Sequence, residues 1–272
     1  VRLAPGTYIL HAPVRVPART RLAGPPDHSA VLRGGPVLRK EVTADLVAGS
    51  EHVEVADVQG LSPGVCVFMP NRAAGSRAQR NIIKSVDGNR VTVARPWNFS
   101  QPAAQCALWT LRPLVEVNEA TDVVVENLYL DAADYGFAGN PPERAWDEVA
   151  SADYAPVIVY GSRRVAVVRN WVANSAGSGI VCGHGSYDCI LSDNRVWHMT
   201  FDGIHIGGGS EGVRIERNRI WDCHDQAGVY VCWWNRNATI RGNQIYFAKW
   251  GVANIDPFEA GMTICDNLIA WT

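Results

Sequence analysis

An asparagine recurs with a near-constant period in the second half of the chain, and this repeat limits the possible folds more than any other feature. Each copy closes a short alternating segment, for example residues 165–170 and 213–218. Neighbouring copies are 24 or 25 residues apart, at Asn170, Asn194, Asn218, Asn243 and Asn267. An earlier asparagine, Asn127, precedes Asn170 by 43 residues, which fits one period plus an inserted loop. A fixed period of this length indicates a repeat architecture.

A second element recurs in phase with the asparagines. It is a glycine followed by a short apolar run, at Gly179, Gly203, Gly228 and Gly251. Short apolar runs separated by Gly, Asn, Asp and Ser are typical of strands broken by turns. The period leaves no room for a helix of ten residues, and it lacks the helical pattern of a βαβ repeat and the leucine frame of a leucine-rich repeat. The sequence therefore predicts a β-solenoid whose rungs stack about 4.8 Å apart.

The recurring asparagines have a structural explanation in such a stack. Asparagine tolerates left-handed turn geometry, and its amide both donates and accepts hydrogen bonds along a column of like amides. We expect all six, Asn127 included, to share one turn column and to have no catalytic role.

This pattern resembles the pectate-lyase-like superfamily over residues 123–272. The opening Pro5-Gly6-Thr7-Tyr8 and the later Leu22-Ala23-Gly24 are also similar to the first coil of such proteins. The resemblance implies an all-β fold, a single right-handed parallel β-helix over residues 1–272 with about 24 residues per coil. Two segments break the period. Residues 41–112 are expected to form a β-hairpin insertion, and residues 134–154 an inserted loop that serves as a lid or cleft wall.

Composition excludes several classes of partner. The chain has 25 Lys and Arg against 27 Asp and Glu, so no excess of positive charge favours nucleic acid. No apolar run approaches the roughly 18 residues of a membrane span. Seven cysteines without CxxC spacing argue against a zinc cluster and leave disulfides undecided. We expect a protein that is secreted or periplasmic, with any signal peptide removed or not included in this sequence, and the oligomeric state stays open.

Strand alternation suggests where chemistry takes place. The residue after each recurring glycine is expected to point into the core and the next one to solvent. This outward column contains His205 and Tyr230 on adjacent rungs. Asp202, Asp225 and Lys249 precede the same strands. A base with a near-neutral pKa, a phenol and orienting charges form an acid–base site. Alternatively, His205 and Tyr230 are ordinary exposed strand residues that stack for stability.

Further residues are expected to bind substrate around this site. His184, Trp233 and Trp234 follow the same strands, and indole rings suit the apolar face of a sugar. A second outward column after the asparagine turn, formed by Trp197, Trp221 and Tyr246, is more typical of a structural aromatic ladder. His198, Asp222 and His224 lie in the turn that leaves that column and are expected to border the same cleft, where His224 is predicted to bind substrate. Their spacing matches no metal-ligand motif, so no metal is predicted there.

One local likeness is more specific. The segment from Trp250 to Glu259 resembles the Tyr-Gly-Phe-Asp-Pro-His-Glu segment of the alginate C5-epimerases, whose Asp and His take part in proton transfer at C5. Asp256 and Glu259 match that segment, whereas Phe258 replaces its His and Trp250 its Tyr. The resemblance implies a substrate-binding role for Asp256 and Glu259 and gives none to Phe258 in catalysis.

Three functions remain from the sequence. The first is a polysaccharide lyase or epimerase, in which His205 or Tyr230 removes the proton α to a uronate carboxylate while Lys249 or an arginine neutralises that carboxylate. It requires no cofactor, although relatives of this fold often use Ca²⁺. The second is a glycoside hydrolase with Asp202 and Asp225 as paired carboxylates. The third is a non-catalytic glycan-binding or tailspike-like module.

Overall fold

A computed structural model describes residues 1–70, 79–133, 154–254 and 260–272. The expected lid, residues 134–154, lies outside the described residues except for Tyr154. Asp256 and Glu259 also lie outside them, as does the side chain of Asp225.

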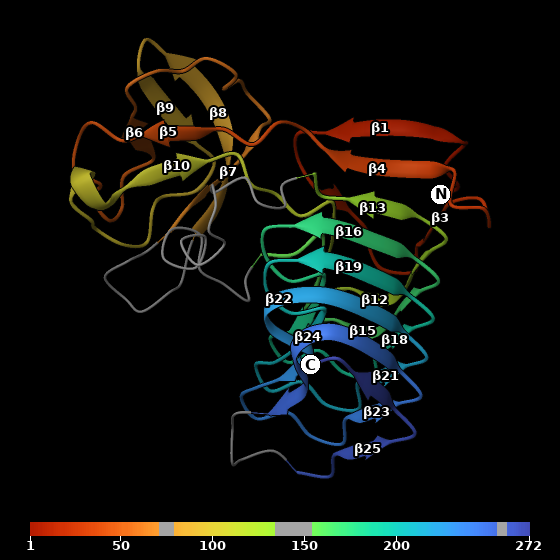
Figure 1. Cartoon of the computed structure of the whole chain (residues 1–272). Coiled ribbons are helices and arrows are strands. Elements are labelled where there is room, and N and C mark those ends of the chain that lie inside the picture. Colours follow the sequence, from red (N-terminus) through yellow and green to blue (C-terminus); the bar gives the residue numbers. More distant parts are fainter. Residues whose placement is uncertain (71–78, 134–153, 255–259) are drawn as a thin grey trace.

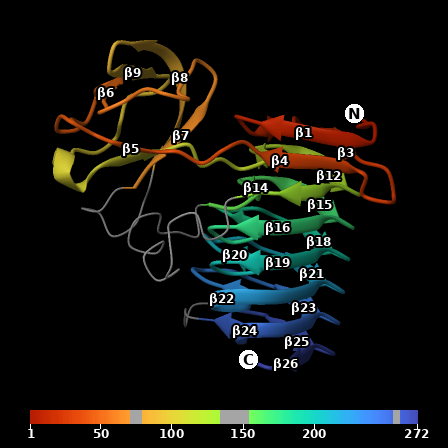
Figure 2. The ribbon, with the colours of Figure 1, turned by 45° about the horizontal axis from the view of Figure 1, so that its top comes forward.

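Each coil of the chain runs through three strands that pair with their counterparts in the next coil. One coil contains β15 (Arg163–Val168), β16 (Trp171–Ser175) and β17 (Ile180–Gly183). The next contains β18 (Ile190–Ser192), β19 (Arg195–Met199) and β20 (Ile204–Ile206). All three pairings are parallel and in register. The predicted parallel β-helix is therefore confirmed, and Figures 1 and 2 show its coils stacked along one axis.

Repetition of this coil builds two long parallel sheets. The seven-stranded sheet also contains β3 (Arg21–Ala23), β12 (Thr121–Glu126), β21 (Arg214–Glu216), β23 (Thr239–Arg241) and β25 (Thr263–Cys265). The other sheet has 13 strands and is divided here into two faces.

The β16 face of the 13-stranded sheet contains β16 and β19 together with β1 (Gly6–Leu10), β4 (Ala30–Gly34), β13 (Tyr129–Asp131) and β26 (Leu268–Ala270). The β17 face contains β17 and β20 together with β2 (Val14–Arg15), β11 (Val115–Asn118) and β14 (Val157–Tyr160). Two long strands, β22 (Arg219–Val231) and β24 (Gln244–Asn254), run through both faces and join them.

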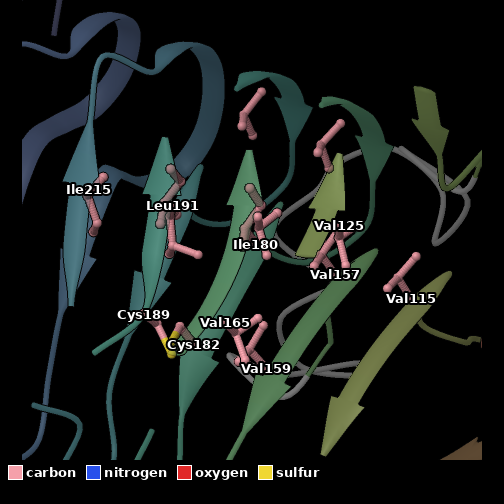
Figure 3. Close-up of a cluster of buried hydrophobic side chains, with 14 of the residues drawn as sticks. Val115, Val125, Val157, Val159, Val165, Ile180, Cys182, Cys189, Leu191 and Ile215 are labelled. Carbon is pink, nitrogen blue, oxygen red and sulfur yellow. The ribbon is translucent and has the colours of Figure 1, made fainter. Parts of the chain in front are cut away.

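The interior of the solenoid is filled by aliphatic side chains from every coil. Val157, Val159 and Ile180 are among the fully buried ones, and Figure 3 shows such side chains meeting between the sheets. β-branched residues fit this pleated and enclosed surface well. The alternation that places them inside also sends the intervening residues to the outer side of each strand.

An asparagine ladder closes the turn between the seven-stranded sheet and the β16 face. The Oδ1 atom of Asn218 accepts hydrogen bonds from the backbone N and from Nδ2 of Asn194, both at 3.0 Å. The Nδ2 atom of Asn194 also donates to the Val167 carbonyl at 2.9 Å. Equivalent bonds join the five asparagines from Asn170 to Asn267.

The prediction that Asn127 belongs to this ladder is wrong by one residue. Val125 pairs with Val167, so Leu128 occupies the rung below Asn170 and donates its backbone N to the Asn170 Oδ1 at 3.1 Å. Asn127 itself has a φ of 55°. Asparagine suits this position because it tolerates the left-handed backbone conformation, and not because it forms ladder hydrogen bonds. The inserted loop changes the length of this period, so spacing alone did not reveal the register.

Residues between β4 and β11 form a separate antiparallel sheet with its own core. Its strands are β5 (Arg39–Glu41), β6 (His52–Glu54), β7 (Cys66–Met69), β8 (Gln79–Asp87), β9 (Arg90–Val93) and β10 (Ala107–Trp109). This sheet lies beside the end of the solenoid that carries β1 and β4 (Figure 1). A single 3-10 turn, η1 (Ala103–Gln105), is the one helical element of the described residues. None of these residues forms a helix able to cross a membrane.

Candidate active site

Strand alternation on the β17 face brings His205 and Tyr230 together. Ile204 and Ile206 point into the core, so His205 between them points outward. His205 pairs with Tyr230 on the next rung, and their ring centroids lie 4.9 Å apart with the planes tilted by 34°. The structure therefore places the two residues side by side, as the repeat predicts.

The expectation that this outward column faces solvent is wrong for its first members. His205 is 4% exposed and Val181, its neighbour on the preceding rung, 2% exposed, whereas Tyr230 is half-buried. Val181 packs with Ala155 and Ile158 in a small cluster on the outer side of the sheet. Alternation fixes the direction of a side chain, but the chain that packs over the sheet decides its exposure.

Asp202 holds one nitrogen of His205. The Asp202 Oδ2 lies 2.9 Å from the His205 Nδ1, and the Asp202 carboxylate is completely buried. Its other oxygen, Oδ1, accepts a hydrogen bond from the Ala227 amide at 3.1 Å. Asp202 is therefore placed to orient the imidazole and does not face outward itself.

Cys232 contacts the other nitrogen of His205. The Cys232 Sγ lies 3.2 Å from the His205 Nε2, and both side chains are buried. Cys232 was not among the residues that the sequence predicted for this site. A signal was present, because Cys232 follows Tyr230 by two residues and so points to the same side of the strand.

The surroundings favour the charged form of His205. Burial alone would lower the pKa of this imidazole. The hydrogen bonds and charges of Asp202 and Cys232 overcome that effect and raise the pKa of His205 to about 10. Burial raises the pKa of Asp202, against the opposing hydrogen bond and charge of His205. At neutral pH the imidazole therefore holds its proton, so it is suited to donate a proton or to stabilise negative charge.

Three residues that were expected to bind substrate follow the strands of the β17 face and are exposed. The His184 ring packs edge-on against Tyr160, with centroids 4.2 Å apart, and is exposed in the turn after β17. Trp233 and Trp234 follow Cys232 and are exposed, at 55% and 56%. Both have a positive φ, at 58° and 68°.

Other expected residues are not linked to His205 by any described contact. The Lys249 ammonium lies 5.1 Å from the Trp250 ring centroid, opposite the irregular part of β22 between Cys223 and Ala227. His224 is exposed in that part of β22. Asp256, Glu259 and the side chain of Asp225 lie outside the described residues, so their predicted roles stay predictions. Within the described residues, no three His, Cys, Asp or Glu side chains are grouped to bind a metal.

The β16 face carries a larger aromatic surface than the sequence indicated. Trp197 and Trp221 stack in parallel, with centroids 5.0 Å apart and an interplanar angle of 3°. Arg219 lies over the Trp221 and Tyr246 rings, at 5.5 and 5.9 Å. We call the following half-buried residues the aromatic face: Tyr129, Trp171, Trp197, Trp221 and Tyr246. Tyr129, Trp171 and the arginines were missed because they fall outside the expected column.

A row of polar side chains connected by hydrogen bonds and ion pairs lies beside the aromatic face. The His198 Nε2 lies 3.3 Å from the Asp222 Oδ2, and its Nδ1 lies 3.1 Å from the Asn174 Oδ1. Asn174 in turn donates from Nδ2 to the Asp131 Oδ1 at 2.8 Å. The predicted neighbours His198 and Asp222 thus meet, and they form a ladder of hydrogen bonds.

Comparisons with known proteins agree with this architecture. A family model described as "Right handed beta helix region" matches residues 115–268. No curated protein sequence matches the chain. Solved structures with similarity include the tailspike gp61 of Pseudomonas phage phi297, at 14% identity and a TM-score of 0.46, with 98% of this chain and 54% of that chain covered.

Two further solved structures illustrate the range of similar proteins. XylC in complex with xylose has 9% identity and a TM-score of 0.46, with 98% of this chain and 60% of that chain covered. PfbA, a surface adhesin of Streptococcus pneumoniae, has 10% identity and a TM-score of 0.39, with 98% of this chain and 70% of that chain covered. The chain thus spans only a little over half the length of the tailspike and of XylC.

Proposed function

The chain belongs to the right-handed β-helix family, and we propose that it is a carbohydrate-active enzyme that works by proton transfer at Asp202, His205 and Tyr230. The observation that carries this proposal is the buried Asp202–His205 pair beside the half-buried Tyr230 ring. Ionisable groups with a strongly shifted pKa cluster at functional sites. This arrangement combines a proton-holding imidazole with a phenol on one side of one sheet.

The aromatic face supports a carbohydrate as the substrate. Indole and phenol rings present flat apolar surfaces that suit the C–H faces of sugar rings, and their edges accept polar neighbours. Arg195 and Arg219 lie over these rings at 5.3 to 5.9 Å. Guanidinium groups bind carboxylates in a bidentate manner. Stacked rings with guanidinium groups between them therefore favour a glycan that contains uronic acids, and the expected secreted or periplasmic location suits such a polymer.

The proton-transfer groups favour a lyase or C5-epimerase. In this reaction Tyr230, reacting as the phenolate, takes the proton α to the uronate carboxylate, and the His205 imidazolium stabilises the negative charge that develops. In a lyase the bond to the glycosidic oxygen on the neighbouring carbon then breaks and that oxygen takes up a proton, whereas in an epimerase C5 takes up a proton on its opposite face. The division of roles follows from the raised pKa of His205, because a protonated imidazole cannot act as the base. Asp202 keeps the imidazole oriented and charged. No metal takes part in this scheme, so a chelator should leave turnover unchanged.

The paired-carboxylate hydrolase receives less support. Asp202 is fully buried, and its oxygens are bound to His205 and to the Ala227 amide. A carboxylate in this position lacks access to a glycosidic oxygen. A non-catalytic glycan-binding protein is the second candidate, because the aromatic face would bind sugars whether or not the His205 site turns over.

A product screen by mass spectrometry tests the proposal. The protein is incubated with neutral and uronic polysaccharides, with and without EDTA. Cleavage without added water identifies a lyase, and unchanged mass with altered C5 stereochemistry by NMR identifies an epimerase. Cleavage with added water would replace the proposal by a hydrolase. Binding to the polymers with no chemical change would leave the non-catalytic candidate.

A further inference from the structure

Three side chains at the His205 site are arranged in the order carboxylate, imidazole and thiol. The Asp202 Oδ2 lies 2.9 Å from the His205 Nδ1, and the His205 Nε2 lies 3.2 Å from the Cys232 Sγ. A nucleophile within hydrogen-bond reach of a base, which is itself oriented by a third group, is the geometry of covalent catalysis. Proton transfer between Tyr230 and a uronate makes no use of the cysteine.

The backbone of the neighbouring rung passes close to the sulfur. Cys232 belongs to a column that runs over Gly183 and Gly207, which carry no side chains. A Cβ atom on Gly207 would lie 2.9 Å from the Cys232 Sγ and 3.2 Å from the His205 Nε2. The contact between sulfur and imidazole therefore depends on glycine at position 207.

A backbone donor is available beside the nucleophile. Trp233 directly follows Cys232, and within the described part of the chain its amide N has no hydrogen-bond acceptor. Its φ of 58° turns the chain sharply after the cysteine. Amides placed next to a nucleophile stabilise the oxyanion that forms during acyl transfer.

From this geometry we propose that Cys232, His205 and Asp202 form a nucleophilic triad that removes acyl ester groups from the glycan. The proposal rests on the proposed function for the identity of the alcohol, a sugar hydroxyl, and it adds an ester as the group on which the site acts. Cys232 is the nucleophile, His205 the acid and base, and Asp202 the positioning residue.

The reaction balances without any other reactant than water. Because His205 already holds its proton, the reaction begins from the Cys232 thiolate beside the His205 imidazolium, and the sulfur forms a bond to the ester carbonyl carbon. The bond from that carbon to the sugar oxygen breaks, and the imidazolium proton passes to the leaving oxygen. Water then attacks the thioester with the now neutral His205 as base, the carbon–sulfur bond breaks, and the thiolate and the imidazolium are restored. The products are the free acid and the sugar hydroxyl.

The test uses 4-nitrophenyl acetate as the probe and the whole protein. The wild type should release nitrophenolate and carry an acetyl group on the peptide that contains Cys232, detected by mass spectrometry after an acid quench. Cys232→Ala should lower the rate of release by about 10² or more. Cys265→Ala is the matched control, because Cys265 is a partly exposed cysteine on β25, in the other sheet, and should keep the wild-type rate.

Two more variants keep the test decisive if Cys232→Ala fails to fold. His205→Gln keeps the cysteine and removes its imidazole partner, and Gly207→Ala forces sulfur and imidazole apart. Each should lower acetylation of Cys232 by about 10² or more in protein whose circular dichroism matches the wild type. Absence of an acetyl group on Cys232 in the wild type, or a wild-type rate in the folded variants, would overturn the triad.

An assay on a uronic polysaccharide without esters separates the two proposals. Unsaturated or epimerised product without any acetyl-cysteine would retain the proposed function and overturn the triad. Acetyl-cysteine and ester hydrolysis without such product would retain the triad and overturn the lyase or epimerase.

Discussion

The Nδ1 atom of His205 lies 2.9 Å from the Oδ2 atom of Asp202 in a position where neither side chain has appreciable contact with solvent. A buried carboxylate that contacts one imidazole nitrogen fixes the orientation of the ring and favours its protonated form. The behaviour of His205 should therefore depend strongly on Asp202.

Replacing Asp202 by Asn should test this dependence. The variant retains a hydrogen-bonding side chain of the same shape but removes the negative charge, so the pKa of His205 should fall. Two-dimensional NMR of the imidazole nitrogens should show titration at lower pH than in the wild type. Turnover on the substrate should fall by about 10² or more. An unchanged imidazole titration would show that the carboxylate does not control the charge of His205.

Protein stability should decrease as the pH rises above neutrality. The pKa of His205 is about 10 in the folded protein, compared with 6.5 for an unperturbed histidine. Its contribution to stability is fully present below pH 6.5 and is lost as the pH rises towards 10. Urea unfolding at a series of pH values should show this decline. His205→Gln should have a flatter profile across the same range, and an equally steep decline in that variant would assign the effect to other groups.

The asparagine ladder should contribute measurably to folding. Asn218→Leu removes the acceptor for Asn194 and leaves buried amide groups without partners. The expected loss is about 1 to 3 kcal/mol in the free energy of unfolding, measured by urea denaturation. Asn127→Gly is the matched control, because glycine accepts the left-handed backbone there and no ladder bond is lost. A control loss as large as that of Asn218→Leu would contradict the ladder.

The aromatic face should determine binding of the glycan. Trp197→Ala and Trp221→Ala remove stacked rings on the β16 face, whereas the His205 column lies on the β17 face, so KM should rise several-fold while kcat changes little. Isothermal titration with a uronic oligosaccharide should show the same loss of affinity. Tyr187→Ala is the control, because Arg163 lies 4.9 Å over the Tyr187 ring outside the aromatic face. If all three variants changed KM and affinity equally, the aromatic face would have no specific role in glycan binding.

The sequence predicted the fold well because the repeat is set by local chemistry. Glycine and asparagine at fixed spacing mark the turns, and the apolar residues between them fix which side of each strand faces the core. The same reasoning placed His205 beside Tyr230. It failed at Asn127, where the inserted loop changed the period and moved the register by one residue.

The sequence predicted less of the candidate site than of the fold. His205 points to the outer side of its strand and is nevertheless only 4% exposed, which no strand pattern reveals. The contact between Cys232 and His205 joins the end of one strand to the middle of its neighbour in the sheet, and it depends on the space left by Gly207. The exact rotamers and packing that create these contacts follow from tertiary structure alone.

Incubation in deuterated water measures directly the proposed transfer of the proton α to a uronate carboxylate. We expect the wild type to yield a polymer with deuterium at C5, or a cleaved product with a carbon–carbon double bond. Tyr230→Phe, which keeps the ring against His205, should lower either product by about 10² or more while its thermal unfolding matches the wild type. Cleavage with addition of water and no deuterium on carbon, or full activity of folded Tyr230→Phe, would contradict the account.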